Sequence, residues 1–416
     1  MRVCIHRGTK QIGGTCIEVE AQGKRIALDV GLPLDAGDRK DYEGLLPQVP
    51  GFRDPDDSLL GVVISHPHMD HYGLAKFIRS DLPVYIGERA NAILKAASNY
   101  VPEGSYFKNA IHYEAWKPTQ IGPFSITPYL ADHSAFDAYS LLIEADGKRL
   151  FYSGDFRGHG RKQKVFDNLL KNPPKDIDVL MMEGTTISRA NTEKGFPTED
   201  DLENDFVNDI KRTDGLYLVY ASAQNIDRVV TIFRAAKKTG RHLLIDLYAA
   251  VVLEAVDTGT IPQSSWDGVS LYVPHGQRIR IKEDELFDDL KKHSLNRIYA
   301  EDLAKNPNKY VMLMRPWMSR DLDFAKCTDG ARFAYSMWSG YLEEDHLKKF
   351  QSWLEKRGIP LTQIHTSGHA PVKDLKRFAK ALAPKRLVPI HSFETDQFVD
   401  HFSNVETKDD GDWWGV

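Results

Sequence analysis

Cysteine is scarce in this sequence. Only Cys4, Cys16 and Cys327 occur in 416 residues, and no two of them have the close spacing of a zinc ribbon or a redox motif. A small secreted fold held by disulfides needs an even and denser set of cysteines. We therefore expect reduced, buried thiols and a cytoplasmic protein.

Long apolar runs are also missing. No stretch approaches the roughly 20 consecutive apolar residues of a membrane-spanning helix, and residues 1–7 turn polar too early for a signal peptide. We therefore expect no association with a membrane. With 42% hydrophobic residues the chain can instead bury a sizeable core, and its length suggests two or three domain-sized units.

The sequence has no excess of positive charge, since its formal net charge is -5. Neutralisation of phosphates drives the binding of proteins that coat nucleic acids. The charge balance therefore excludes a generally basic protein of that class, although local basic clusters remain.

One dense cluster of polar side chains is present, because residues 66–71 read His-Pro-His-Met-Asp-His. The cluster directly follows residues 59–65, an apolar run typical of a buried strand, so it lies where α/β folds build sites. Imidazole and carboxylate groups suit zinc and its first-row neighbours. The spacing allows His66 and His68 to face one ion while Asp70 and His71 face another. The alternative is a histidine-rich surface loop without ligands.

Four ligands cannot complete two metal sites, so later strands should supply others. His133 follows the strand-like residues 124–130, and Asp155 follows residues 149–152. His391 comes directly after a further apolar run. Each residue alone would be interpreted as a capping or hydrogen-bonded side chain. In this order after the first cluster, all three become candidates for the missing ligands.

The ordered set of Asp29, residues 66–71, His133, Asp155 and His391 resembles the metallo-β-lactamase fold, an α/β fold with a four-layer αββα sandwich. The resemblance implies two metal ions, zinc or alternatively manganese, with Asp155 bridging them. It also implies that Asp29 orients the ligands through hydrogen bonds, although a turn-forming role ahead of Gly31 is the alternative for Asp29. The implied ligands are His66, His68 and His133 for one ion and Asp70, His71 and His391 for the other.

A long segment separates Asp155 from His391, and it has an α/β pattern of its own. Helix-like residues 201–212 and 226–239 alternate with strand-like residues 215–220 and 242–246. Residues 218–222 and 227–241 resemble the inserted domain of the β-CASP nucleases. We therefore predict an inserted α/β β-CASP domain at residues 198–355, between the first part of the core at 1–197 and its closing part at 356–416.

Two further residues match this branch of the fold. Glu183 follows an apolar run, and His369 lies in the sequence Ser-Gly-His-Ala, which is closest to the ribonuclease J group. The resemblance implies that Glu183, His369 and Asp70 are catalytic and that Ser367 and Gly368 contact the substrate. A turn residue is the alternative for His369, and we interpret His365 as structural.

The predicted function is hydrolysis of nucleic-acid phosphodiesters by a binuclear metal enzyme. We expect single-stranded RNA as the substrate, with single-stranded DNA as an alternative. A small-molecule hydrolase of the same fold, acting on an ester, a thioester or a cyclic phosphodiester, is a second alternative. Assembly into a homo-oligomer is left open.

The sequence also departs from ribonuclease J. Those enzymes usually continue into a further C-terminal domain, whereas this chain ends 25 residues after His391, so we expect that domain to be absent. Where they carry a stretch like Gly-Ser-Gln-Gly-Glu-Pro, residues 313–320 read Leu-Met-Arg-Pro-Trp-Met-Ser-Arg. Equivalence in processivity, dimerisation and 5′-end recognition therefore does not follow.

Several basic and aromatic residues have less specific patterns. The basic residues in 157–164, including Arg157, and in 376–386 flank predicted site residues, so we assign them a provisional role in guiding a phosphate backbone. Arg278, Arg280 and Lys282 alternate along a strand-like run. For Trp317, Trp338 and Tyr341 we favour core packing over base stacking. We expect the tail, which ends in Trp413-Trp414 before Gly415 and Val416, to dock on its own chain or a partner.

Overall fold

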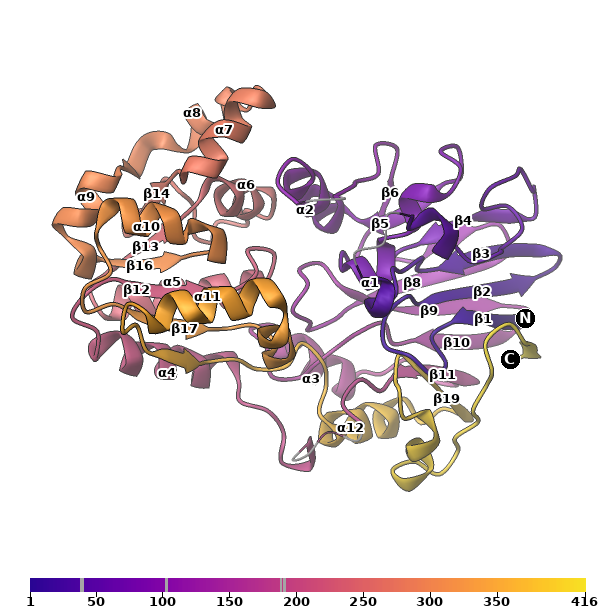
Figure 1. The fold of residues 1–416 in the computed structure, drawn as a ribbon. Helices are drawn as coiled ribbons and strands as arrows, with labels where there is room; N and C mark the ends of the chain where they lie inside the picture. Colours follow the sequence, from indigo (N-terminus) through magenta and orange to yellow (C-terminus); the bar gives the residue numbers. More distant parts are fainter. Residues whose placement is uncertain (38–40, 102–103, 188, 190–191) are drawn as a thin grey trace. The chain divides into compact units, whose positions relative to one another are not determined.

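The computed structural model describes residues 1–37, 41–101, 104–187, 189 and 192–416. The chain forms two compact units (Figure 1). Unit 1 comprises Met1–Lys95, Glu103–Phe196 and Gly368–Val416, and unit 2 comprises Ala96–Pro102 and Pro197–Ser367. The inserted domain expected at residues 198–355 falls within unit 2, which extends further, to Ser367.

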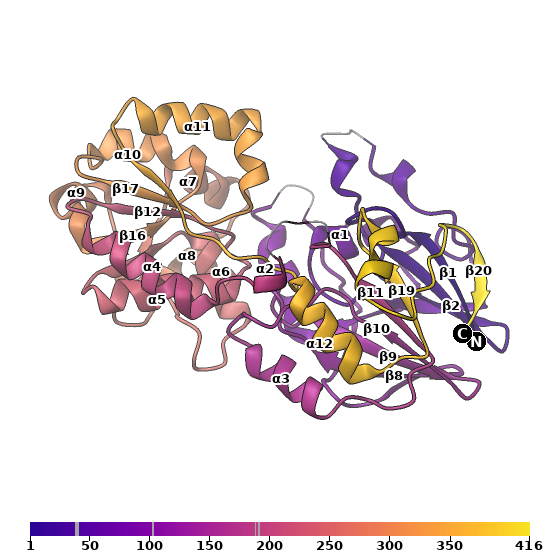
Figure 2. The same ribbon diagram turned by 90° about the horizontal axis from the view of Figure 1, so that it is seen from below.

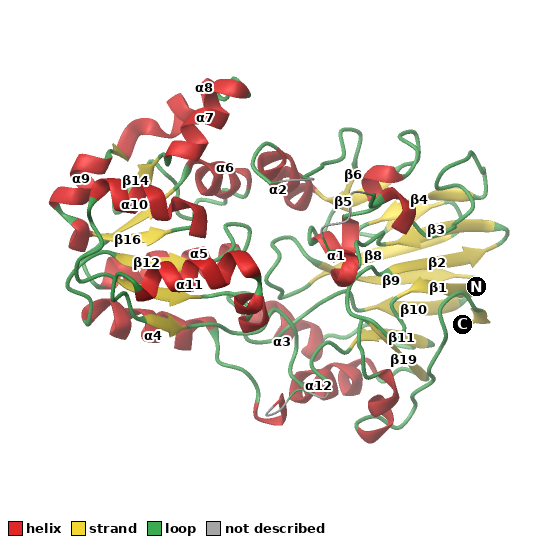
Figure 3. Ribbon diagram, viewed as in Figure 1, coloured by secondary structure: helices red, strands yellow, loops and turns green. Residues whose placement is uncertain are grey.

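Unit 1 contains two sheets that pack face to face (Figures 1 and 3). Their shared core includes Ile17, Leu28, Leu141 and Met181, all fully shielded from solvent. The first sheet has the order β20 (Trp413–Gly415), β1 (Arg2–Arg7), β2 (Cys16–Ala21), β3 (Lys24–Leu28), β4 (Leu59–Val63), β5 (Val84–Gly87), β6 (Ile111–Tyr113). The second has the order β19 (Arg386–Ile390), β11 (Val179–Glu183), β10 (Lys148–Tyr152), β9 (Tyr139–Ala145), β8 (Phe124–Leu130), β7 (Thr119–Ile121).

Helices cover the outer faces of these sheets, which completes the predicted αββα sandwich. The short α1 (Met69–Tyr72) and α2 (Glu88–Ser98) pack on the first sheet. On the second sheet, α3 (Gln163–Lys171) and α12 (Val372–Leu382) lie side by side (Figure 2). Helix α12 forms and docks because its apolar residues recur every three or four positions, which gives one buried face. These buried residues are Val372, Leu375, Phe378 and Leu382.

Unit 2 is a parallel sheet with helices on both faces, an arrangement typical of doubly wound α/β domains. Helices α10 (Ser319–Ala325) and α11 (Asp345–Glu355) pack on one face, while α4 (Glu199–Lys211) packs on α5 (Ile226–Lys238) and α5 packs on the strands. The strand order is β15 (Arg297–Ile298), β14 (Val269–Tyr272), β13 (His242–Ile245), β16 (Tyr310–Leu313), β12 (Tyr217–Tyr220), β17 (Arg332–Tyr335), β18 (Leu361–Gln363). The other helices are α6 (Leu247–Ala255), α7 (His275–Glu283), α8 (Phe287–His293) and α9 (Ala300–Lys305).

The strand-like run at residues 278–282 is a wrong prediction, because these residues lie in α7. The alternation of basic and apolar residues suggested a strand. However, Gln277 and Ile281 are the buried residues of this helix, whereas Ile279 is 45% exposed. Burial at positions four residues apart is helical spacing, and Pro274 precedes the helix as its N-cap residue.

The tail docks on its own chain, which was expected as one alternative to docking on a partner. Strand β20 pairs with β1, and the Arg2 guanidinium lies 5.1 Å from the centre of the Trp413 ring. The thiols of Cys4, Cys16 and Cys327 are free and buried, also as expected. Among the residues that the structure describes, no helix is both long and apolar enough to cross a membrane.

The second sheet of unit 1 depends on Phe151, which has no exposed surface and contacts the rings of Tyr129 and Phe378. We expect Phe151→Ala to lower the free energy of unfolding by about 3–5 kcal/mol, because it leaves a cavity between sheet and helices. Urea unfolding followed by circular dichroism measures this change. Phe393→Ala is the control, since Phe393 is 62% exposed and its removal should have little effect.

Candidate metal centre

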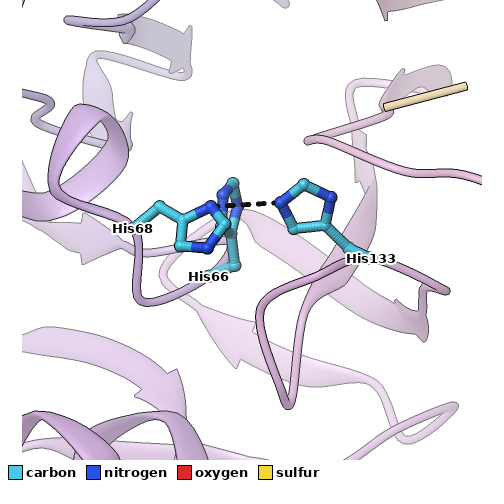
Figure 4. Close-up of side chains that lie close together, drawn as sticks. All are labelled: His66, His68 and His133. Carbon is cyan, nitrogen blue, oxygen red and sulfur yellow. Dashed lines mark hydrogen bonds between the residues drawn. The ribbon is translucent and has the colours of Figure 1, made fainter. Parts of the chain in front are cut away.

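The first group of predicted ligands comes together at the end of β4. His66 and His68 lie in the extended segment after this strand, and His133 follows β8 (Figure 4). Nδ1 of His68 lies 3.1 Å from Nε2 of His133. One ligand atom from each of the three residues lies within 4.8 Å of the others. These side chains form one compact all-nitrogen group.

The second group contains Asp70, His71, Asp155 and His391, again with ligand atoms within 4.8 Å of one another. Asp70 and His71 occupy the first turn of α1, so they leave the backbone in a different direction from His66 and His68. Oδ2 of Asp155 lies 3.2 Å from Nε2 of His71 and 3.7 Å from Nε2 of both His66 and His391. Asp155 therefore lies next to members of both groups.

Buried polar atoms without partners show that these residues fit divalent metal ions. Among the described residues, Nε2 of His66, His71 and His391 and both carboxylate oxygens of Asp155 are buried without hydrogen-bond partners. Leaving a polar atom buried and unpaired costs about 1–3 kcal/mol. A set of imidazole nitrogens with a carboxylate is the donor set that zinc and similar metals prefer.

Each of four histidines uses Nδ1 for a partner outside the cluster, which leaves Nε2 directed at the other ligands. Such outer partners select the tautomer and orient the ring of a metal-binding histidine. The pairs are His66 with Ser65 Oγ at 3.0 Å, His71 with Asp29 Oδ2 at 2.8 Å, His133 with the Gly368 carbonyl at 2.7 Å, and His391 with Thr15 Oγ1 at 3.0 Å. Ser65 and Thr15 were not predicted from the sequence, because a lone hydroxyl residue carries no recognisable spacing.

Asp29 contacts both parts of the 66–71 cluster. Its carboxylate accepts hydrogen bonds from the backbone and the hydroxyl of Ser65, from His71 and from the Tyr152 hydroxyl. Its φ of 56° lies in the left-handed region, so Asp29 also has the turn conformation that was the alternative interpretation. Two residues later, a Cβ on Gly31 would lie 1.7 Å from the Asp70 carbonyl oxygen, so only glycine allows this approach.

Burial and charge set the protonation of the cluster. Burial lowers the pKa of His66 and His133 well below the ordinary value, and it lowers the pKa of His68 to about 4. Burial would raise the pKa of Asp155, but His391 and His71 outweigh it and lower that pKa well below its usual range. His71 differs, since burial lowers its pKa but Asp155, Asp70 and Asp29 outweigh it and raise that pKa well above the ordinary value. Neutral His66, His68 and His133 beside a charged carboxylate have the protonation states that metal binding requires, whereas His71 would lose a proton when a metal binds.

Glu183 and His369 form a pair beside this cluster. Oε2 of Glu183 lies 3.1 Å from Nδ1 of His369, which in turn lies 3.7 Å from Oδ2 of Asp155. Glu183 is fully buried, and its carboxylate accepts hydrogen bonds from the backbone N–H groups of Phe156 and Thr185. Burial lowers the pKa of His369, but Glu183 and Asp155 outweigh it, and the pKa is raised above the ordinary value.

Comparisons with known proteins agree with this geometry. Residues 40–203 match the beta-lactamase superfamily domain, and residues 360–409 match the Zn-dependent metallo-hydrolase RNA specificity domain. The chain carries a metallo-β-lactamase domain. Its homologues include ribonuclease J of Mycoplasma genitalium, 22% identical over 92% of this chain and 66% of that protein, and ribonuclease J 1 of Streptococcus pyogenes, 23% identical over 92% and 67%.

A solved structure shares the fold over the whole chain. The crystal structure of a protein of unknown function from Enterococcus faecalis has a TM-score of 0.81 at 21% identity and covers 99% of both chains. An RNase J-like protein of Methanocaldococcus jannaschii is 29% identical over 50% of this chain. The chain spans about two thirds or less of the length of these curated relatives.

Gly368, within the matched RNA specificity domain, contacts a predicted metal ligand, and its role at the substrate stays a prediction. Its carbonyl accepts the hydrogen bond from His133, and a Cβ on Gly368 would lie 2.7 Å from Ser134 Oγ. Ser367, the last residue of unit 2, is half-buried. The Ser-Gly-His turn thus holds a predicted metal ligand through Gly368 and carries His369 as the next residue.

Arg157 does not have the predicted place at a phosphate backbone. Its side chain has no exposed surface, and its Nε lies 3.5 Å from Oδ1 of Asp132, which is also fully buried. Removing an arginine from solvent requires such a carboxylate, so Arg157 has a role inside the domain. Four of the five cations of residues 376–386 are also paired: Lys376 with Glu193, Arg377 with Asp374 and Asp167, Lys385 with Asp178, and Arg386 with Glu406.

We expect Asp29→Asn to weaken metal binding by roughly 10–100-fold, the usual effect of losing a partner of a metal ligand. The asparagine amide is neutral, so it cannot offer Ser65, His71 and Tyr152 the negatively charged hydrogen-bond acceptor that the Asp29 carboxylate provides. Competition with a chromophoric zinc chelator measures the affinity. Asp146→Asn is a matched control, because Asp146 lies in the turn between β9 and β10, where it contacts Gln22 and the N-terminus. Equal affinities of Asp29→Asn and the control would contradict the expectation.

Proposed function

We propose that this chain is a metal-dependent ribonuclease that hydrolyses phosphodiesters of single-stranded RNA with two metal ions. Three observations support the proposal: the two ligand groups around Asp155, the match to an RNA specificity domain, and homology to ribonucleases J over most of the chain. The three free thiols support a cytoplasmic location. We also propose that residues 198–355 form the inserted domain.

The pair of Glu183 and His369 is the observation on which the assignment as a phosphodiester hydrolase rests. A hydrolase that only needs to activate water at its metals does not require a protonated histidine next to them. The cleavage of a phosphodiester leaves an alkoxide that must be protonated, and a protonated histidine beside the ligand groups suits that step. Nδ1 of His369 lies 3.7 Å from the Asp155 carboxylate, so the ring that would supply that proton lies directly beside the predicted metal ligands.

The residues that would hold the metals follow from the two groups. His66, His68 and His133 would hold one ion, His71, His391 and Asp70 the other, and Asp155 would contact both. We propose zinc, with manganese as the alternative, because both accept imidazole and carboxylate ligands. When bound, two such ions activate a water as the nucleophile and stabilise negative charge on the phosphate.

The protein supplies the proton and its orientation. Nδ1 of His369 is engaged by Glu183, so Nε2 is the atom that donates a proton to the leaving oxygen. The Glu183 carboxylate stays in place because two backbone N–H groups bind it, and its charge favours the imidazolium form of His369. The Gly368 carbonyl bound to His133 keeps the Ser-Gly-His turn next to the ligands.

One assay tests the function directly. Purified protein with Zn²⁺ or Mn²⁺ is incubated with end-labelled single-stranded RNA and DNA that bear 5′-hydroxyl, monophosphate or triphosphate ends. We expect cleavage of RNA and about two equivalents of transition metal per chain. Cleavage of DNA without cleavage of RNA would show that the substrate is DNA and not RNA. Hydrolysis of an ester or thioester without cleavage of either nucleic acid would overturn the proposal.

Two histidine variants separate proton transfer from metal binding. We expect His369→Ala to keep both metals but to lose roughly 10²–10⁴-fold in turnover, the usual contribution of general acid catalysis. His68→Ala should instead lose metal, as measured by elemental analysis. His365→Ala is the matched control, since this histidine is four residues earlier and contacts the backbone of Ser336 at 3.3 Å. A turnover of His369→Ala equal to that of wild type would refute the general-acid role.

A further inference from the structure

The parallel sheet of unit 2 has a topological switch point. The chain leaves β12 and β13 toward the β15 edge, whereas it leaves β16, which lies between them, toward the β18 edge. Connections that diverge from adjacent parallel strands open a crevice at their carboxyl ends, and doubly wound domains bind ligands there. The residues that follow β12, β13 and β16 are therefore the place to look for a second site.

Arg315 comes two residues after β16, at the carboxyl end of the sheet where these connections diverge. Its guanidinium pairs with Asp246, the residue directly after β13, and lies 4.8 Å from the centre of the Tyr248 ring. Gln224, which follows β12, donates a hydrogen bond to the Tyr248 hydroxyl at 2.9 Å. Within the described part of the chain, Nη2 of Arg315 is buried without an acceptor. An unpaired guanidinium donor would be satisfied by an oxygen of a ligand.

Trp317 lies next to this arginine and is exposed. The expectation of core packing is wrong for Trp317, Trp338 and Tyr341, which are 46%, 52% and 39% exposed. The Trp317 ring lies beside the first turn of α7, since a Cβ on Gly276 would approach it to 3.5 Å. The turn of Trp317 and the turn of Tyr341 both pack against α11. An indole that is half exposed at a strand end is available for stacking.

Two arginines accompany Trp317. Arg320 is exposed, and no ion pair or hydrogen bond of its side chain exists among the described residues. Arg278 on α7 is 53% exposed and lies 4.0 Å from Asp321, so it is only loosely paired. Both cations can bind a phosphate without breaking a close salt bridge.

We propose that Trp317, with Arg320 and Arg278, binds one nucleotide of single-stranded RNA, the base stacking on the indole and the arginines binding its phosphate. This inference rests on the proposed ribonuclease function and adds a substrate contact within unit 2. The residues belong to the segment 313–320, in which this chain departs from the sequence of ribonuclease J. One stacked base with its phosphate supplies only part of the affinity for a single strand, because successive bases and phosphates each add a contact. The ligand is therefore a strand rather than a free mononucleotide.

Binding without cleavage tests the stacking. Fluorescence anisotropy of a labelled RNA decamer, oligo(A), is measured with metal-stripped protein in chelator. We expect Trp317→Ala to bind roughly tenfold more weakly than wild type and Trp317→Phe to recover most of the affinity. Trp116→Ala is the control, because Trp116 is a 52% exposed tryptophan of unit 1. Wild-type affinity in Trp317→Ala, or an equal loss in the control, would overturn the inference.

The salt dependence tests the phosphate contact. We expect Arg320→Ala to reduce the slope of log Kd against log salt concentration by about 0.7, the value for one phosphate of a single strand. An unchanged slope would overturn the role of Arg320. Tight binding of AMP that competes with oligo(A) would overturn the choice of a strand as the ligand.

A small substrate separates this inference from the proposed function. Hydrolysis of bis(p-nitrophenyl) phosphate by metal-loaded protein should be the same in wild type and Trp317→Ala, because this substrate is too short to use the stacking contact. If wild type cleaves RNA but Trp317→Ala binds it equally well, only the stacking site fails. If wild type neither binds nor cleaves RNA, the proposed function fails as well.

Discussion

The burial of the Asp155 carboxylate is the constraint on which the site depends. Both of its oxygens are buried without a hydrogen-bond donor, and Oδ2 lies 3.2–3.7 Å from ring nitrogens of four histidines, His71, His66, His391 and His369. A buried charge of this kind is costly unless positive charge compensates it. Divalent metal ions would provide that charge, and the same ions would satisfy the unpaired nitrogens. The positions of the histidines and of the loops that carry them are therefore arranged around one carboxylate.

The precision of this arrangement comes from partners outside the cluster. Asp29, Thr15 and the carbonyl of Gly368 each hold the Nδ1 of one histidine, and they come from three different parts of the chain. Such contacts fix ring orientation before any ion binds. The contact of Gly368 has a second consequence, since His369 is the next residue. A movement of the His133 ring would therefore also displace the proposed general acid.

The two units use strand ends in different ways. In unit 1 the ligands follow strands of two packed sheets, so the site forms where these strands end. In unit 2 the strands are parallel, and the connections from the adjacent strands β13 and β16 run toward opposite edges of the sheet, the topology at which doubly wound domains bind ligands. Arg315, Trp317 and Arg320 follow the end of β16. A short segment with no metal-binding residue thus becomes a candidate nucleic-acid contact through its place in the sheet topology and the exposure of Trp317.

The αββα sandwich and the full grouping of the candidate ligands were predicted from the resemblance to the metallo-β-lactamase fold. Local sequence patterns alone predicted a metal site, because closely spaced histidines after an apolar strand are typical of one. Local patterns also placed α4, β12, α5 and β13 of unit 2, whose apolar periodicity is local. They failed where neighbours distant in sequence decide the outcome. Arg157 is buried against Asp132, residues 278–282 form a helix, and Trp317 is exposed, all because of surrounding elements. Thr15 likewise could not be identified from the sequence, since it lies 376 positions away from His391, its hydrogen-bond partner. Local patterns specify which chemical groups are present, whereas burial and hydrogen-bond partners arise only when distant segments pack together.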